Sequence, residues 1–238
     1  RQRQMCIRDR SKRLHAVASL VTEGASVADI GTDHGYIPIY LIEKGISPRA
    51  IAMDINRGPL KRAKIHIRER GMEEVIETRL SDGLSALLPG ETDTMVAAGM
   101  GGGLVIRILD GTPEVTQSLK EFILQPQSEI RKVREYLSRN GYLTVAEDMV
   151  EEDGKFYPMM KVVHGKESVH DEAELLYGRK LLEARHPVLY RYLMREKGMK
   201  QKIREGLLTQ GGSRSRQRLM ELEEELALTE LALERYRI

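Results

Sequence analysis

Polar and glycine residues that can do chemistry follow an apolar run in the stretch "VADIGTDHGYIP", Val27 to Pro38. Four kinds of site are compatible with it: a catalytic Asp–His pair, a metal site, a phosphate-binding loop or the rim of a cofactor pocket. No Ser or Cys in a nucleophile-elbow setting accompanies Asp33 and His34. His34 also lacks a second ligand at metal-binding spacing, and the turn lacks the lysine of a phosphate loop. We therefore favour the cofactor-pocket rim, in which His34 packs without a proton role.

The ends of further expected strands carry similar residue types. Asp54 ends the second strand and precedes Ile55, and an acid there can accept both hydroxyls of a ribose. Asp82 follows the third strand, where its carboxylate can accept the exocyclic amine of an adenine. Each has a structural alternative, because Asp54 can cap a helix and Ser-Asp-Gly is ordinary turn chemistry. The residues of the two polar turns are Gly31, Thr32, Asp33, His34 and Gly35 after the first strand, and Ser81, Asp82 and Gly83 after the third.

Glycines and amides follow the fourth and fifth strands. The segment from Ala98 to Gly102 leaves backbone room for a flat or bulky group, and Met100 can pack on a ring. The amides of Gln125 and Gln127 can each donate and accept hydrogen bonds, which suits the edge of a nucleobase. Packing alone is a poor explanation for five successive strand ends with such residues. Ligands of open α/β sheets bind at these ends. The pattern G-x-x-x-G departs from the G-x-G-x-x-G of NAD sites.

Strands and helices alternate along the first two thirds of the chain, which predicts a doubly wound α/β domain. The last two strands are joined only by "EEDGK" and should pair antiparallel, whereas the earlier ones should be parallel. We expect Pro126 to stop the fifth strand, Ser128 to cap the next helix, and Pro158 to mark a late strand start or a bulge. The expected strands are 26–30, 50–55, 75–83, 93–103, 121–127, 142–150 and 155–163; the expected helices are 14–21, 37–44, 59–70, 104–109 and 128–139.

The pattern from about residue 171 onward is helical, with a break at Pro187 and a turn at Gly211 and Gly212. Two helices joined by a short turn predict an antiparallel, coiled-coil-like hairpin. We therefore expect an α/β domain at 11–165 and a helical domain at 168–238, with residues 1–10 extraneous or disordered. The segment from Arg179 to Arg218 contains twelve Lys or Arg residues and only three Glu. Such a surplus is either a solvated helix face or a phosphate-binding surface.

Bulk composition excludes several classes of protein. The chain has 238 residues and no apolar run near the roughly 20 residues that span a membrane. Its N-terminus has no apolar core of the kind found in a secretory signal. The single Cys6 cannot form an internal disulfide, and no cysteine cluster suggests zinc. We expect a cytoplasmic protein without a metal, with a monomer as the simpler state.

Several motifs together resemble the bacterial tRNA (adenine-N1)-methyltransferases that modify adenine 22 in the D-loop region. They are "VADIGTDHGYIP", "AMDIN", "RLSDGL", "AAGMGG", "LQPQ" and the stretch from "LSRNGYLTVAEDMV" to "KFYPMMKV". The order of glycine turn, ribose acid and adenine acid is also that of class I S-adenosylmethionine-dependent methyltransferases. The resemblance covers about Ser11 to the C-terminus. Departures are Gly35 in place of another small residue, Pro158, and the first nine residues, which match nothing.

The resemblance implies S-adenosylmethionine as cofactor, tRNA as partner and methyl transfer to adenine N1. Asp33 would face the ammonium group of the cofactor, and the basic stretch from Arg179 to Arg218 would help to grip RNA. The attacking N1 bears no proton, so no general base is assigned. The cofactor-binding residues would be Asp29, Gly31, Thr32, Asp33, His34, Gly35, Asp54, Ile55, Ser81, Asp82, Gly83, Ala98 and Gly99; the base-positioning residues would be Gly99, Met100, Gly101, Gly102, Gln125, Pro126 and Gln127.

Three alternatives stay open at this point. One is a class I methyltransferase that acts on another RNA or on a small molecule. Another is a nicotinamide-dependent oxidoreductase on the same sheet, against which the missing middle glycine counts. The third is a non-enzymatic scaffold whose hairpin recruits a partner, against which the residues at all five strand ends count.

Overall fold

The computed structural model describes residues 11–168, 170–210 and 213–237. The contacts within the chain divide it into two compact units, residues 1–168 and 169–238, which we describe separately. Two of our predictions concern residues outside the described ones: the segment 1–10 and the turn at Gly211 and Gly212. No helix in the described part of the chain is long and apolar enough to cross a membrane.

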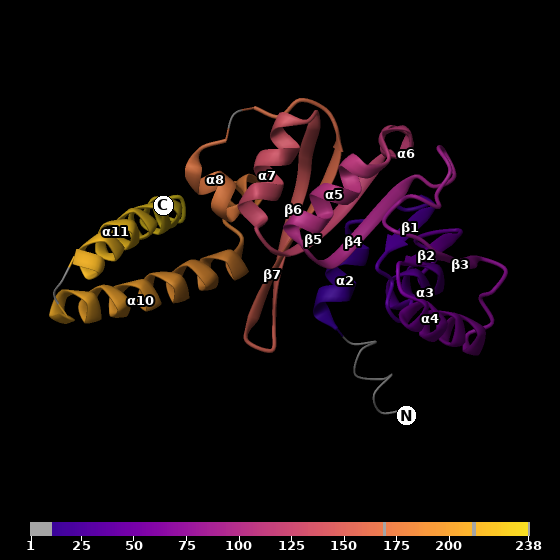
Figure 1. Cartoon of the computed structure of the whole chain (residues 1–238), viewed down its shortest axis with the longest axis horizontal. Helices are drawn as coiled ribbons and strands as arrows, with labels where there is room; N and C mark the ends of the chain where they lie inside the picture. Colours follow the sequence, from indigo (N-terminus) through magenta and orange to yellow (C-terminus); the bar gives the residue numbers. More distant parts are fainter. Residues whose placement is uncertain (1–10, 169, 211–212, 238) are drawn as a thin grey trace. The chain divides into compact units, whose positions relative to one another are not determined.

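The first unit is built on one seven-stranded sheet with the order β3-β2-β1-β4-β5-β7-β6 (Figure 1). Strands β1 to β5 run parallel, and β7 pairs antiparallel with both β5 and β6, which confirms the predicted doubly wound sheet and its closing hairpin. The strand order reverses between β1 and β4, so a crevice forms at their carboxyl ends. The strands are Val27–Ile30 (β1), Ala50–Asp54 (β2), Ile76–Leu80 (β3), Thr94–Gly101 (β4), Glu121–Ser128 (β5), Tyr142–Glu152 (β6) and Lys155–His164 (β7).

Helices cover both faces of this sheet. Val17, Leu41 and Ile67 bring α2, α3 and α4 into one buried apolar cluster. Val105, Val115 and Val133 bring α5, α6 and α7 into the other cluster. Burial of each such side chain stabilises the fold by about 1.5–3 kcal/mol, so the helices hold the strand ends in fixed places. The helices are Lys12–Ser19 (α2), Tyr36–Glu43 (α3), Arg57–Glu69 (α4), Gly102–Gly111 (α5), Pro113–Ser118 (α6) and Ile130–Arg139 (α7).

Two predictions around the end of β5 are wrong. Pro126 does not stop the strand, which continues to Ser128 and pairs with β4 there. The pairing of β5 with β7 covers only residues 121–124, so the missing N–H of Pro126 costs no bond on that side. Ser128 does not cap the next helix, because its pairing with Gly101 keeps it in the sheet. Glu129 precedes α7 instead, in a left-handed conformation with φ of 52°.

The predictions about Pro158 are also wrong. Strand β7 begins before it, at Lys155, and Pro158 pairs with Met149 of β6 without a bulge. The irregularity in this pair lies between Thr144 and Ala146. Strand β7 meets β5 only from Met160 onward, so Pro158 lies where β7 has one neighbour and a missing donor is tolerated. The short helix α6 is an element that the sequence analysis missed.

The second unit is helical, as predicted. Helix α10 begins at Pro187, the position where a proline is tolerated because its N–H would be unpaired anyway. Lys197 pairs with Glu230 and Lys200 approaches Glu225, so residue numbers rise along α10 as they fall along α11. The two helices are therefore antiparallel, which confirms the predicted hairpin. The helices are Glu172–Tyr177 (α8), Arg179–Glu183 (α9), Pro187–Gln210 (α10) and Ser213–Glu234 (α11).

Candidate active site

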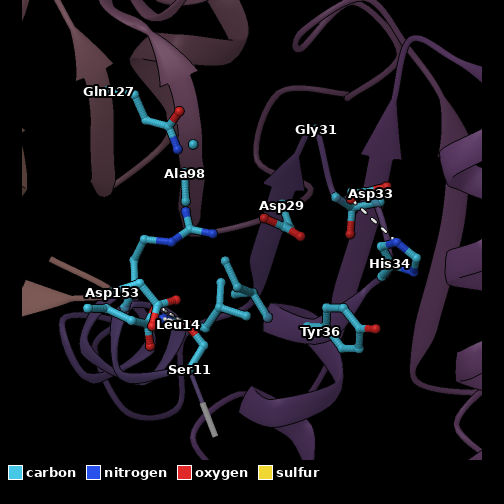
Figure 2. A pocket seen from close by; sticks show the side chains of 15 residues that line it. Ser11, Leu14, Asp29, Gly31, Asp33, His34, Tyr36, Ala98, Gln127 and Asp153 are labelled. Atoms are coloured by element: carbon cyan, nitrogen blue, oxygen red, sulfur yellow. Dashed lines mark hydrogen bonds and ion pairs between the residues drawn. The ribbon is translucent and has the colours of Figure 1, made fainter. Parts of the chain in front are cut away.

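A cavity of about 630 Å³ opens in the first unit at the carboxyl ends of β1 and β4. Its size lies within the range of sites that hold cofactors and small molecules. Figure 2 shows Asp29 between Ala98 on one side and Asp33 on the other. The lining residues are Ser11, Arg13, Leu14, Asp29, Gly31, Thr32, Asp33, His34, Tyr36, Ile37, Ala98, Gly99, Gln127, Glu152 and Asp153.

Asp29 is the most constrained acid of the cavity. It lies within β1 with only 3% of its surface exposed. Burial raises the pKa of its carboxyl to about 7; the nearby Thr32 hydroxyl opposes this rise, and the neighbouring Asp54 carboxylate adds to it. No basic side chain pairs with Asp29 in the described part of the chain. Because a nearby cation favours the ionised form, a positively charged ligand would complete this site.

The turn after β1 has a fixed backbone. Gly31 has φ of +70°, and a Cβ atom on it would lie 2.5 Å from Cε of Met100. The N–H of Thr32 donates to the carbonyl of Met53, and the N–H of Gly35 donates to the carbonyl of Thr32. Glycine is therefore favoured at Gly31 chiefly for its φ, because the flexible end of the Met100 side chain could shift away from a Cβ atom. The turn is held against β2 and cannot move independently of the sheet.

The Asp–His pair of this turn is engaged with its surroundings. A carboxylate oxygen of Asp33 lies 2.7 Å from Nη2 of Arg62 and another lies 3.5 Å from Nε2 of His34. The imidazole ring of His34 packs against both Tyr36 and His66 at centroid distances of 5.2 and 5.3 Å, and the rings of Tyr36 and His66 also lie 5.5 Å apart. Ring packing thus accounts for the position of His34. No group of three His, Cys, Asp or Glu side chains suited to a metal ion occurs among residues that the structure describes.

The two predicted amides lie in different environments. Gln125 is fully buried, and its Oε1 accepts hydrogen bonds from the N–H of Gly99 at 3.1 Å and from Nη1 of Arg13 at 3.0 Å. Gln127 is exposed and lines the cavity. Gln125 therefore positions the chain around Gly99, whereas Gln127 is placed to meet a ligand.

Helix α2 and the β6–β7 turn form a side of the cavity that the sequence analysis missed. Glu152 accepts hydrogen bonds from the Ser11 hydroxyl at 3.0 Å and from the Lys12 N–H at 2.6 Å, so it holds the N-terminus of α2. This contact places Arg13, whose guanidinium lies 5.5 Å from the centre of the Tyr157 ring. The sequence signals were Ser11 as a helix start and Asp153-Gly154 as a hairpin turn. Neither signal indicates a cavity, because both describe only local structure.

Other predicted residues lie beside the cavity and not on its lining. Asp54 is buried and accepts a hydrogen bond from the N–H of Asn56 at 2.7 Å, and Ile55 is 56% exposed. Ser81 bonds within its own turn, and the exposed Asp82 lies 3.3 Å from Arg107. These residues occupy the ends of β2, which pairs with β1, and of β3, which lies beyond β2. The predicted residues outside the lining are Gly35, Asp54, Ile55, Ser81, Asp82, Gly83, Met100, Gly101, Gly102, Gln125 and Pro126.

The sheet order, the glycine turn and the cavity at the β1–β4 switch point are those of a class I, Rossmann-like methyltransferase. A family model described as "Methyltransferase domain" matches residues 10–160. A curated protein of Bacillus subtilis, the tRNA (adenine(22)-N(1))-methyltransferase, is 33% identical over 224 residues, which are 92% of this chain and 94% of that protein. The chain belongs to the tRNA (adenine(22)-N(1))-methyltransferase family.

Two solved structures are similar along nearly the whole chain. A Streptococcus pneumoniae protein in complex with S-adenosyl-L-methionine is 31% identical with a TM-score of 0.83, over 94% of this chain and 99% of that one. The M. capricolum TrmK, in complex with S-adenosyl-homocysteine, is 27% identical with a TM-score of 0.81, over 95% and 99% of the two chains. The predicted family is thus confirmed and is favoured over an oxidoreductase or a scaffold.

Proposed function

We propose that this protein transfers a methyl group from S-adenosylmethionine to N1 of the adenine at position 22 of tRNA. The observation that supports the proposal best is the buried Asp29, which has no basic partner among the described residues, beside a glycine turn at the switch point of a methyltransferase sheet. A protein that used this sheet only as a scaffold would have no reason to bury a carboxyl there at an energetic cost.

The cavity suits this cofactor in charge and in backbone room. S-adenosylmethionine has an ammonium and a sulfonium group, and the cavity lining contributes Asp29, Asp33, Glu152 and Asp153. Gly31 and Gly99 both have positive φ and line the cavity with backbone alone. We assign the methionine half of the cofactor to the β1 turn. We assign its ribose and adenine to the ends of β2 and β3, where Asp54, Ile55 and Asp82 would contact them.

The reaction needs positioning more than acid–base catalysis. When bound, S-adenosylmethionine supplies an electrophilic methyl group. The N1 lone pair forms the new bond to the methyl carbon as the carbon–sulfur bond breaks, and that electron pair stays on sulfur. The adenine becomes positively charged, and no proton has to be removed in this step. The chain therefore contributes chiefly by alignment of the reacting atoms. Gln127 and the backbone from Gly99 to Gly102 would hold the base, and Gln125 would hold Gly99 in place.

The tRNA would meet both units of the chain. Adenine N1 lies on the Watson–Crick edge, so the base must leave any pairing and stacking before it can react. In the helical unit, Arg179, Lys180, Lys197, Lys200 and Arg218 pair with carboxylates. The contribution to RNA binding would then rest on exposed cations such as Lys202 and Arg216, which have no carboxylate partner among the described residues. A tRNA substrate implies work in the cytoplasm, and we keep the monomer as the simpler state.

Methyl transfer from labelled S-adenosylmethionine to unmodified bacterial tRNA tests this function. The matched control is the same tRNA with guanine in place of adenine 22. We expect N1-methyladenosine, identified by mass, in the first tRNA and none in the second. Transfer to both tRNAs would overturn the assigned position. Cofactor binding without transfer would overturn the substrate, and no cofactor binding would overturn the proposal as a whole.

A further inference from the structure

Helix α4 of the methyltransferase unit carries four cations on one side. Arg57, Lys61, Lys64 and Arg68 follow one another at steps of four, three and four residues, the spacing of a single helix face. All four are exposed, whereas Ala63 and Ile67 are buried. At about 1.5 Å of rise per residue, the four extend over roughly 16 Å. We call them the α4 basic stripe.

The charges of the α4 basic stripe are mostly not neutralised by the protein. Arg57, Lys61 and Lys64 make no hydrogen bond or ion pair with any residue that the structure describes. Arg68 approaches Glu73 at 3.2 Å in a surface pair whose side chains are 74% and 45% exposed. Such exposed pairs are weak. The stripe therefore presents a positive surface to solvent.

The stripe also opposes the stability of its own helix. The first turn of α4 has no acidic residue, and Arg57 occupies its first position. A cation near the positive end of the helix dipole is unfavourable, and an anion there is favourable. Helix stability thus does not explain why Arg57 is basic. A negatively charged partner bound along the stripe would turn the unfavourable charge into a favourable one.

Helix α4, which carries the stripe, belongs to the same unit as the cavity (Figure 1). Helix α4 follows β2, whose last residue is Asp54, and Arg62 of this helix pairs with Asp33 on the cavity lining. Gly35 of the β1 turn packs against Ala63, since a Cβ atom on Gly35 would lie 3.4 Å from the Ala63 side chain. A chain whose reacting group enters the cavity would pass close to α4.

We propose that the α4 basic stripe binds the phosphate backbone of the RNA whose adenine enters the cavity. This inference rests on the proposed function and adds a second RNA contact to that of the helical unit. Unpaired Lys and Arg side chains suit a phosphate backbone, whose binding is chiefly electrostatic. An anionic membrane is a poorer partner, because the apolar side of α4 is buried in the core and only Ile65, 47% exposed, is free to insert.

The test compares two triple variants that remove the same number of charges. One is Arg57→Gln/Lys61→Gln/Lys64→Gln in the stripe. The control is Arg131→Gln/Arg139→Gln/Lys166→Gln, at exposed positions of α7 and beyond β7. We expect the stripe variant to bind tRNA roughly tenfold or more weakly. The slope of log binding constant against log salt concentration should become less steep by about two to three. The control should bind tRNA as the unaltered chain does, and both variants should bind S-adenosylmethionine normally.

A single substitution separates RNA binding from folding. Arg57→Glu places an acid in the first turn of α4, so its melting temperature should equal or exceed that of the unaltered chain, while tRNA binding weakens. Equal tRNA binding by the stripe and control variants would overturn the inference. If the stripe variant no longer binds vesicles of anionic lipid but binds tRNA as the unaltered chain does, the stripe would be assigned to a membrane instead. Failure of the proposed function would appear separately, as no methyl transfer by the unaltered chain.

Discussion

The cavity rim and the α10–α11 hairpin are both rich in polar side chains, but they satisfy them in opposite ways. At the rim, Asp29 is buried with no basic partner in the described part of the chain, and Gln125 is buried as the shared acceptor of two donors. On the hairpin, Lys197 pairs with Glu230 and Arg218 with Glu225, at exposed or half-exposed positions. Exposed pairs cost and contribute little, whereas buried polar groups are expensive. The energetic cost of placing a group therefore indicates a site better than the count of charges.

The sharpest test of the rim is Asp29→Ala. We expect S-adenosylmethionine to bind about a hundredfold more weakly, because hydrogen bonds to charged groups contribute roughly 1.5–3 kcal/mol. The unliganded variant should unfold at the same or a higher temperature, since a costly buried carboxyl is gone. Calorimetric titration and thermal unfolding measure the two effects.

The control for that experiment is Asp33→Ala, at the same cavity but in an exposed pair with Arg62. Its effect on cofactor binding should be several times smaller, because solvent already screens this carboxylate. Equal losses from the two variants would mean that burial does not distinguish the acids. Our assignment of Asp29 as the main cation partner would then be wrong.

The two amides of the rim give the next largest effect. Gln125→Ala leaves the Gly99 N–H and the Arg13 guanidinium without their acceptor, so we expect a loss of about 1–3 kcal/mol in unfolding free energy together with slower methyl transfer. Gln127→Ala should unfold within about 0.5 kcal/mol of the unaltered chain, as exposed substitutions usually do, and should change only transfer. Denaturant unfolding and single-turnover transfer distinguish them. Equal stability of the two variants would contradict the division of roles.

The same contrast explains what could be read from the sequence. The edge of the sheet that the strand-end residues share was predictable, because the alternation of strand and helix makes the strands parallel. Asp29, Gly31 and Ala98 lie on the cavity for this reason. The errors at Pro126 and Ser128 arose because local propensity is overridden where β4 and β5 remain paired past Leu124.

The other side of the cavity was not predictable in this way. Arg13 reaches Gln125 across 112 residues of sequence, and Glu152 reaches Ser11 across 141. Contacts of that range depend on how α2 packs on the sheet and on where the β6–β7 turn ends. No local pattern encodes either distance. The ion pairs of the hairpin were missed for a related reason, since the basic stretch was counted without the carboxylates that α11 brings beside it.

The pH dependence of stability offers a smaller test of the rim. The pKa of Asp29 is raised to about 7 in the folded protein from an ordinary value of 3.8. The folded state therefore holds a proton that the unfolded state has released, and the unfolding free energy falls as pH rises through this window. Since one pKa unit corresponds to about 1.4 kcal/mol, we expect at least that loss between about pH 5 and pH 7 in the unliganded protein. The Asp29→Asn variant should not show this loss of unfolding free energy. Parallel curves of unfolding free energy against pH for the two proteins would contradict a raised pKa of Asp29.

The smallest effect is expected on the hairpin, where two double variants remove two positive charges each. Lys197→Gln/Arg218→Gln removes cations that already pair with carboxylates, so tRNA binding should change by less than about twofold. Lys202→Gln/Arg216→Gln removes exposed cations that have no carboxylate partner in the part of the chain that the structure describes, so binding should weaken by a few fold and the salt slope should fall by about one to two. Binding titrations at several salt concentrations measure both. If the paired cations weaken binding as much as the unpaired ones, the RNA must displace their carboxylates, and net charge would be the better guide on this surface after all.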